Sequence, residues 1–170
     1  MGSEMCIRDS GGPCENGLES TIIDCSGESP ILLRPGGISR SAIETALHSA
    51  GLHCRLRDAD ALSDHGQPIS PGQLQSHYAP DASVRLDATS QQGDEELIGF
   101  GSVHGAGQLS LSLSSSGNVR EAAANLFSML HQANAVTTGT QRRIAIAPIP
   151  KDGVGEAIND RLQRAAASRD

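Results

Sequence analysis

The stretch from Asp58 to Pro80 most constrains how this chain can fold, because it divides the 170 residues into two unequal parts. Asp, Ser, His, Gly, Gln and Pro dominate it, and prolines at 68, 71 and 80 interrupt any regular element. A segment of this length without helical or strand periodicity is usually either disordered or functional. We therefore expect two folded regions, 11–57 and 83–170, joined by a linker over residues 58–82.

The first region begins with features of a β-hairpin. Residues 18–24 (LESTIID) and 31–34 (ILLR) are rich in strand-forming residues, and the segment CSGESP between them is typical of a turn. Pro35-Gly36-Gly37 ends the second strand, and Ser39 is a suitable N-cap for a helix that Gly51 closes. Residues 1–10 (MGSEMCIRDS) show no such pattern, and we expect them to be a non-native segment translated from a cloning adapter.

The second region alternates strands with helices. Strands are expected at 83–86, 97–100 and 143–149, and helices at 119–132 and 155–167. Asn118 is the expected N-cap of the first helix. This alternation is characteristic of a parallel or mostly parallel sheet, so we expect an α/β fold with a small three-layer α/β/α unit.

Composition narrows the classes of function. The formal net charge of −7 argues against a general polyanion binder but leaves room for one phosphate or nucleotide. There is no apolar run of the roughly 20 residues that a membrane helix needs, so no membrane partner is expected. The four cysteines form no CxxC pair or zinc spacing, which indicates reduced thiols in a cytoplasmic protein, and we assign no metal site.

Two residues of the first region are candidates for binding. The hydroxyl of Ser20, in Glu19-Ser20-Thr21 at the mouth of a strand, could bind a carboxylate, phosphate or ammonium group, although a turn serine beside a β-forming threonine explains the same residues. Arg34 at a strand end is well placed for two-pronged phosphate binding, although a surface arginine is the plainer interpretation.

Two further features lie in or beyond the linker. His77 and Tyr78 offer a proton carrier and an aromatic plate, and Tyr78 is the only tyrosine of the chain; simple packing on its own domain is an equal alternative. The glycines before the last expected helix resemble a phosphate-binding helix start. A tight turn followed by a helix with an Asp160–Arg164 pair is favoured instead.

In order along the chain, these segments resemble a known family. GGPCENGLESTIID, ILLRPGGIS, SPGQLQSHYAP, REAAANLF and IAIAPIPKDGVGEAINDRLQRAA together look like the L-threonylcarbamoyladenylate synthases. The resemblance is to the long form, with a YrdC-like catalytic domain, a linker and a C-terminal Rossmann-like domain. It implies that 11–57 is the truncated end of the YrdC-like domain, that 58–82 is the linker and that 83–170 is the Rossmann-like domain.

The resemblance also implies an activity. The family is a nucleotidyltransferase that forms threonylcarbamoyl-AMP from L-threonine, bicarbonate and ATP, with Mg²⁺ on the phosphates, and releases pyrophosphate for tRNA modification. By resemblance, Ser20 binds L-threonine, while Arg34 and Tyr78 bind ATP. The family's KxR-type and SxN-type motifs have no match here, so we expect a C-terminal fragment that is inactive alone, and the catalytic residues remain unassigned.

Two other functions are weighed against this one. A non-catalytic regulatory module could bind a partner or make weak contact with tRNA or double-stranded RNA through the arginines between 142 and 169, although the net charge counts against it. A dinucleotide-binding oxidoreductase would need a glycine-rich loop between a strand and a helix. GFGSVHGAG at 99–107 is followed by an apparent strand, so that fingerprint fails.

Overall fold

The computed structural model describes residues 17–59 and 80–167, which form two small β-sheets and three helices. The expectations for residues 1–10, for most of the linker and for Tyr78 therefore lie outside the described residues. In chain order the elements are β1 (Ile22–Asp24), β2 (Ile31–Arg34), α1 (Arg40–Ser49), β3 (Arg57–Asp58), β4 (Val84–Arg85), β5 (Glu96–Ile98), α2 (Val119–Thr137), β6 (Ile144–Ile146) and α3 (Val154–Ala166).

The first sheet contains the predicted hairpin. Strands β1 and β2 pair in the antiparallel sense, with Asp24 opposite Ile31 and Ile22 opposite Arg34, and β3 joins β2 in parallel. The turn between β1 and β2 is held by Asp24, whose carboxylate accepts the backbone N–H of Ser26 at 2.8 Å. The sheet is short, so its buried core is small and consists of Ile31, Leu32 and Leu56.

Both predicted N-caps are confirmed. The Ser39 hydroxyl accepts the Ala42 N–H at the start of α1, and the Asn118 side chain accepts the N–H groups of Arg120 and Glu121 at the start of α2. Helix α2 continues five residues beyond its expected end. Thr137 in this added turn can be buried because its hydroxyl donates a hydrogen bond to the Ala133 carbonyl and therefore does not need a water partner.

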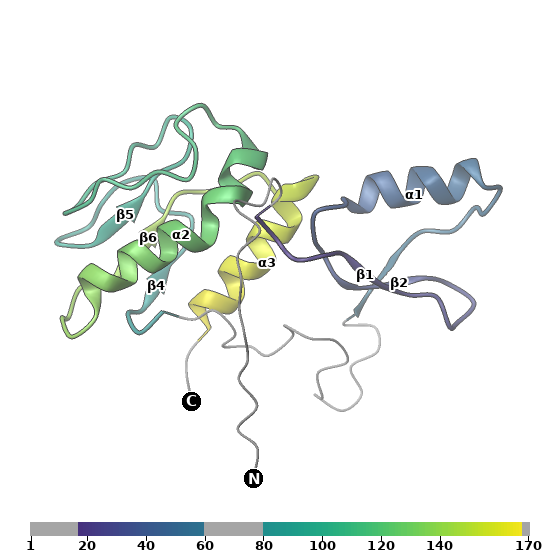
Figure 1. Cartoon of the computed structure of the whole chain (residues 1–170), viewed down its shortest axis with the longest axis horizontal. Helices are drawn as coiled ribbons and strands as arrows, with labels where there is room; N and C mark the ends of the chain where they lie inside the picture. Colours follow the sequence, from purple (N-terminus) through teal and green to yellow (C-terminus); the bar gives the residue numbers. More distant parts are fainter. Residues whose placement is uncertain (1–16, 60–79, 168–170) are drawn as a thin grey trace, which may run out of the picture.

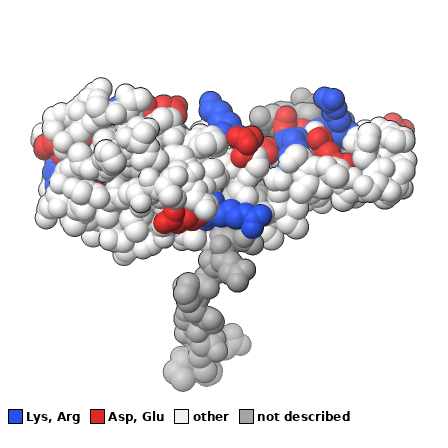
Figure 2. Space-filling model, turned by 90° about the horizontal axis from the view of Figure 1, so that it is seen from above, with Lys and Arg blue, Asp and Glu red and all other residues white. Residues whose placement is uncertain are grey.

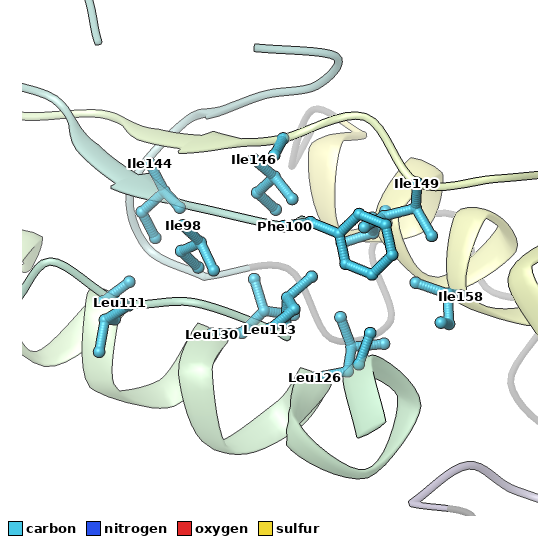
Figure 3. Close-up of a cluster of buried hydrophobic side chains, with 14 of the residues drawn as sticks. Ile98, Phe100, Leu111, Leu113, Leu126, Leu130, Ile144, Ile146, Ile149 and Ile158 are labelled. Atoms are coloured by element: carbon cyan, nitrogen blue, oxygen red, sulfur yellow. The ribbon is translucent and has the colours of Figure 1, made fainter. Parts of the chain in front are cut away.

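The second sheet is parallel throughout, in the order β4-β6-β5, which confirms the α/β class predicted from the alternation. Strand β6 lies between the other two because the α2 crossover carries the chain past β5 and back to the centre. Successive side chains along β6 point to opposite faces of the sheet. Figure 3 shows the larger core beside helix α2, which contains, among others, Ile98, Phe100, Leu113, Leu126, Ile144, Ile146 and Ile158.

The two faces of this sheet are covered differently. Helices α2 and α3 contact one another and contribute to the same core cluster, so both lie on one face. The opposite face carries the smaller cluster of Ala88, Leu97 and Ala145, packed against Val103 and Ala106 from a loop. Within the described residues, loop therefore stands where the three-layer expectation placed a second helical layer.

Helix α3 lies between α2 and the hairpin, so it joins the two parts of the chain (Figure 1). Leu18, just before the hairpin, also packs against the core of the parallel sheet. The two regions that the sequence separates are thus in direct contact. No helix in the described part of the chain is long and apolar enough to cross a membrane.

Candidate functional site

The structure brings two of the three predicted site residues together. The Arg34 guanidinium donates from Nε and Nη2 to the Ser20 carbonyl at 3.1 and 3.0 Å, and from Nη2 to the Ser20 hydroxyl at 3.2 Å. Arg34 ends strand β2 and is 9 % exposed, so its charge is held largely within the protein. A hydroxyl and a guanidinium side by side form a cluster that can bind anionic and polar substrate groups.

The turn after Arg34 approaches the Ser20 segment closely. A methyl group on Gly36 would lie 2.4 Å from both the Glu19 carbonyl oxygen and the Thr21 backbone nitrogen. The Thr21 hydroxyl also holds these two segments together, because it donates to the Ile38 carbonyl at 2.8 Å and accepts the Ile38 N–H. The glycine of the LRPG sequence is therefore needed for close packing of the two segments.

A residue from the far end of the chain also reaches this site. Arg161 on α3 donates from Nε to the Glu19 carboxylate at 3.0 Å and from Nη2 to the Pro35 carbonyl at 3.0 Å. Its side chain is 1 % exposed. From the sequence, Arg161 was expected among the arginines that could contact RNA and after the glycines at the start of the last helix, and no role at this site was predicted for it. The available signal was its position on the apolar face of α3, three residues after Ile158 and next to Leu162.

Three of the arginines proposed to contact RNA, Arg142, Arg161 and Arg164, are paired with carboxylates. Arg142 bonds Glu96 at 3.3 Å, and Arg164 bonds Asp160 at 2.8 Å in the predicted i,i+4 pair. Figure 2 shows acidic and basic side chains next to one another on the face in view. These ion pairs reduce the positive potential that binding to a nucleic acid backbone requires.

The remaining candidates from the sequence provide weaker evidence for a site. Tyr78 lies outside the described residues. Gly153 begins α3 without a side-chain cap, and the nearby hollow at the ends of β5 and β6 is lined mainly by apolar residues: Phe100, Gly101, Ser102, Val103, Pro148, Ile149 and Pro150. In residues 17–59 and 80–167 there is no group of three or more His, Cys, Asp or Glu side chains that could hold a metal ion.

Comparison with known proteins assigns the chain to a family. The model of the family described as threonylcarbamoyl-AMP synthase, C-terminal domain, matches residues 38–167, which is more than half of the chain. The chain belongs to the threonylcarbamoyl-AMP synthase family. The resemblance found in the sequence motifs is therefore confirmed, and the match includes α3 with Arg161.

Individual members of the threonylcarbamoyl-AMP synthase family agree. The chain is 32 % identical over 171 residues to a threonylcarbamoyl-AMP synthase of Bacillus subtilis, and 30 % identical over 183 residues to one of Pyrococcus abyssi. It covers 48 % and 50 % of these proteins, while the matches cover 94 % and 96 % of this chain. The chain thus spans about half the length of the curated relatives it matches.

A solved threonylcarbamoyl-AMP synthase has the same fold. The P. abyssi protein Sua5, in a crystal structure with L-threonine, superposes with a TM-score of 0.69 at 26 % identity, over 92 % of this chain and 48 % of the other. A variant of P. abyssi Sua5 with an adjacent His and Tyr replaced by alanine superposes with a TM-score of 0.65. The mixed α/β fold with its Rossmann-like parallel sheet is therefore that of the family.

Proposed function

We propose that these residues form part of an enzyme that makes threonylcarbamoyl-AMP from L-threonine, bicarbonate and ATP and releases pyrophosphate, for threonylcarbamoylation of tRNA. Membership of the family supports the reaction. The observation in this chain that carries the proposal is the contact between the buried Arg34 and the exposed Ser20, because it joins the two motifs to which the family resemblance gives substrate roles.

The two residues would serve different substrates. Ser20 offers a hydroxyl to L-threonine, and the P. abyssi structure that contains L-threonine supports this class of ligand. Arg34 offers a guanidinium to the phosphates of ATP, which it would bind in a two-pronged fashion. A carbamate oxygen of N-carboxylated threonine then attacks the α-phosphorus, and the bond to pyrophosphate breaks. Such a reaction needs positioning and charge stabilisation but no covalent nucleophile.

Tyr78 would cover the bound nucleotide from the linker. A P. abyssi variant in which adjacent His and Tyr residues are replaced by alanine supports a role for the His77-Tyr78 pair of this chain. An aromatic ring over the site would stack on the base or exclude water from the phosphates.

Magnesium would enter with the nucleotide. The described residues present no carboxylate cluster for a resident ion. Mg²⁺ is commonly held largely by substrate phosphates and water, which fits its delivery as an ATP complex. We also propose a cytoplasmic location, which the free thiols of Cys25 and Cys54 support.

The binding-module alternative has weaker support. It rests on the group of arginines near the C-terminus, and three of these, Arg142, Arg161 and Arg164, are bonded to carboxylates. Breaking such pairs to free the charges for RNA would cost part of the binding energy gained.

The experiment that tests the proposal uses two proteins. One is the 170-residue chain, and the other joins it to the part of the B. subtilis relative that it does not match. Pyrophosphate release that depends on both L-threonine and bicarbonate is measured for each. We expect release from the joined protein and none from the 170 residues alone. Failure of a folded joined protein to release pyrophosphate would contradict the proposed function, and release by the chain alone would contradict its expected inactivity.

A further inference from the structure

A charged side chain is buried where helix α3 meets the hairpin. Arg161 lies on the buried face of α3, with Ala157, Ile158, Leu162 and Ala165, and its guanidinium is almost fully removed from water. An arginine in such a place is expensive to desolvate unless its donors are bonded. The arrangement therefore requires specific partners, and their identity shows what the arginine holds in place.

Two partners of Arg161 lie directly beside the candidate site. Glu19, which accepts from Nε, precedes Ser20, and Pro35, whose carbonyl accepts from Nη2, follows Arg34. The third partner, Asp160, belongs to α3 itself and accepts from Nη1 at 2.5 Å. A single guanidinium thus binds both segments that carry the proposed substrate contacts and ties them to the parallel-sheet region.

We infer that Arg161 is a positioning residue, which sets the distance between Ser20 and Arg34 and so couples the Rossmann-like region to substrate binding. This inference rests on the proposed function. The planar guanidinium offers donors in fixed directions, so its bonds to Glu19 and Pro35 fix both the separation and the orientation of the two segments. The second region then acts on the reaction without touching a substrate.

A second ion pair between the same regions provides a matched control. Arg40 at the start of α1 donates from Nε and Nη2 to the Glu156 carboxylate at 3.1 and 3.0 Å, while Nη2 also contacts Asp58. This pair joins α3 to the first region without binding Glu19 or Pro35. Glu156→Gln therefore weakens the attachment in general, whereas Arg161→Met removes the contacts at the site.

The first arm of the test is hydrogen exchange on the 170-residue chain. We expect Arg161→Met to speed exchange of the Ile22–Asp24 and Ile31–Arg34 amides by about ten- to a hundred-fold, with little change at Ile144–Ile146. Glu156→Gln should leave the amides of both strands nearer to wild type. Unchanged hairpin exchange in Arg161→Met, or equal acceleration in all three strands, would overturn the inference.

The second arm measures the KM of the joined protein for L-threonine and for ATP. Displacing Ser20 and Arg34 should raise both KM values about tenfold or more in Arg161→Met, whereas Glu156→Gln should retain them even if its thermal stability falls equally. Arg161→Lys should recover part of the loss, because one ammonium reaches one of the two partners. The effects of Arg161→Met and Glu19→Gln should also be non-additive.

The outcomes separate the two ideas. Wild-type joined protein without activity contradicts the proposed function, and the exchange experiment still decides whether Arg161 holds the hairpin. An active wild type whose KM values are unaffected by Arg161→Met, or equally affected by Glu156→Gln, overturns the positioning role while the proposed function stands.

Discussion

Arg34 has a structural contact as well as a proposed chemical one. Its Nε and Nη2 atoms hold the Ser20 carbonyl, so the side chain closes the space between the end of β2 and the segment before β1. A lysine could keep the charge here but not the two parallel donors. The same residue therefore defines the shape of the candidate site and contributes its positive charge.

The first prediction concerns the guanidinium group of Arg34. In the joined protein, Arg34→Lys should weaken ATP binding by about 1.5–3 kcal/mol, or about ten- to a hundred-fold, because charged hydrogen bonds are lost. Ser20→Ala should affect L-threonine more than ATP. Calorimetric titration with each substrate measures both effects. Wild-type ATP affinity in Arg34→Lys would show that the residue is structural here.

The double variant of Arg34 and Tyr78 supplies a companion prediction. If Tyr78 covers the nucleotide that Arg34 binds, Tyr78→Ala and Arg34→Lys should be non-additive in ATP affinity. The same calorimetric measurement on both single variants and the double variant tests this. Strict additivity would indicate that the two residues do not act on one bound nucleotide.

Gly36 gives a prediction that depends on packing alone. Gly36→Ala should destabilise the protein by about 1–3 kcal/mol, because its methyl group would meet the backbone of residues 19–21. Gly27→Ala is the matched control, since nothing lies within 4 Å of the corresponding methyl position. Urea unfolding followed by circular dichroism measures the difference. Equal stability of the two variants would argue against the close approach at Gly36.

At the scale of elements, two buried carboxylates lie at the start of strand β5: Glu95 immediately before it and Glu96 as its first residue. Glu96 accepts the N–H groups of Gln108 and Leu109 at 2.8 Å each, so it anchors the loop that covers one face of the sheet. Glu95 bonds Arg85 at 2.6 Å and thereby links β5 to β4 across the central strand.

The Glu95 pair makes stability depend on pH. The hydrogen bond from Arg85 holds the pKa of Glu95 below its ordinary 4.5, although burial opposes this and the Gln92 N–H reinforces it. A carboxyl with a lowered folded-state pKa adds stability above its unfolded pKa and loses it as the pH falls through the folded value. Urea midpoints measured from about pH 7 downward should therefore fall more steeply below pH 4.5 in wild type than in Glu95→Gln.

Glu28 provides the control for this titration. It is exposed in the hairpin turn, so Glu28→Gln should keep the wild-type dependence on pH. Parallel pH profiles for wild type and Glu95→Gln would contradict a stabilising role of the Glu95–Arg85 pair.

At the scale of the whole molecule, the two regions differ in how much core supports them. The parallel sheet is backed by two helices and a large cluster, whereas the hairpin sheet buries few side chains and α1 buries none. Contacts through α3 connect the smaller region to the larger one. The hairpin region thus depends on its neighbour for part of its order.

The last prediction follows from this difference. Amides in Leu97–Phe100 and Arg143–Ile149 should exchange slowly in wild type, and those in Ile22–Asp24 and Ile31–Leu33 should exchange faster, because opening the small sheet exposes little apolar surface. Hydrogen exchange followed by mass spectrometry or NMR measures both sets. Equal protection of the two sets would show that the regions unfold as one unit.

Local patterns predicted the elements well. The caps at Ser39 and Asn118 and the hairpin over β1 and β2 follow from signals within a few residues of each other, and the parallel sheet follows from the alternation of strands and helices along the second region. The order of the motifs along the chain identified the family, because each motif marks a particular local turn or helix end. The strands are shorter than expected, because residues at their ends, such as Gly99 and Phe100, form isolated bridges with other loops.

The sequence alone determined the α/β class, the family and the candidates Ser20 and Arg34, because short-range periodicity and motif chemistry carry that information. Only the tertiary structure decided that Arg34 holds Ser20, that α2 and α3 share one face of the sheet, and that Arg161 is buried against Glu19 and Pro35. Glu19 and Arg161 are 142 residues apart. Their meeting depends on how the helices and sheets pack, and no local pattern encodes the partner of a buried charge.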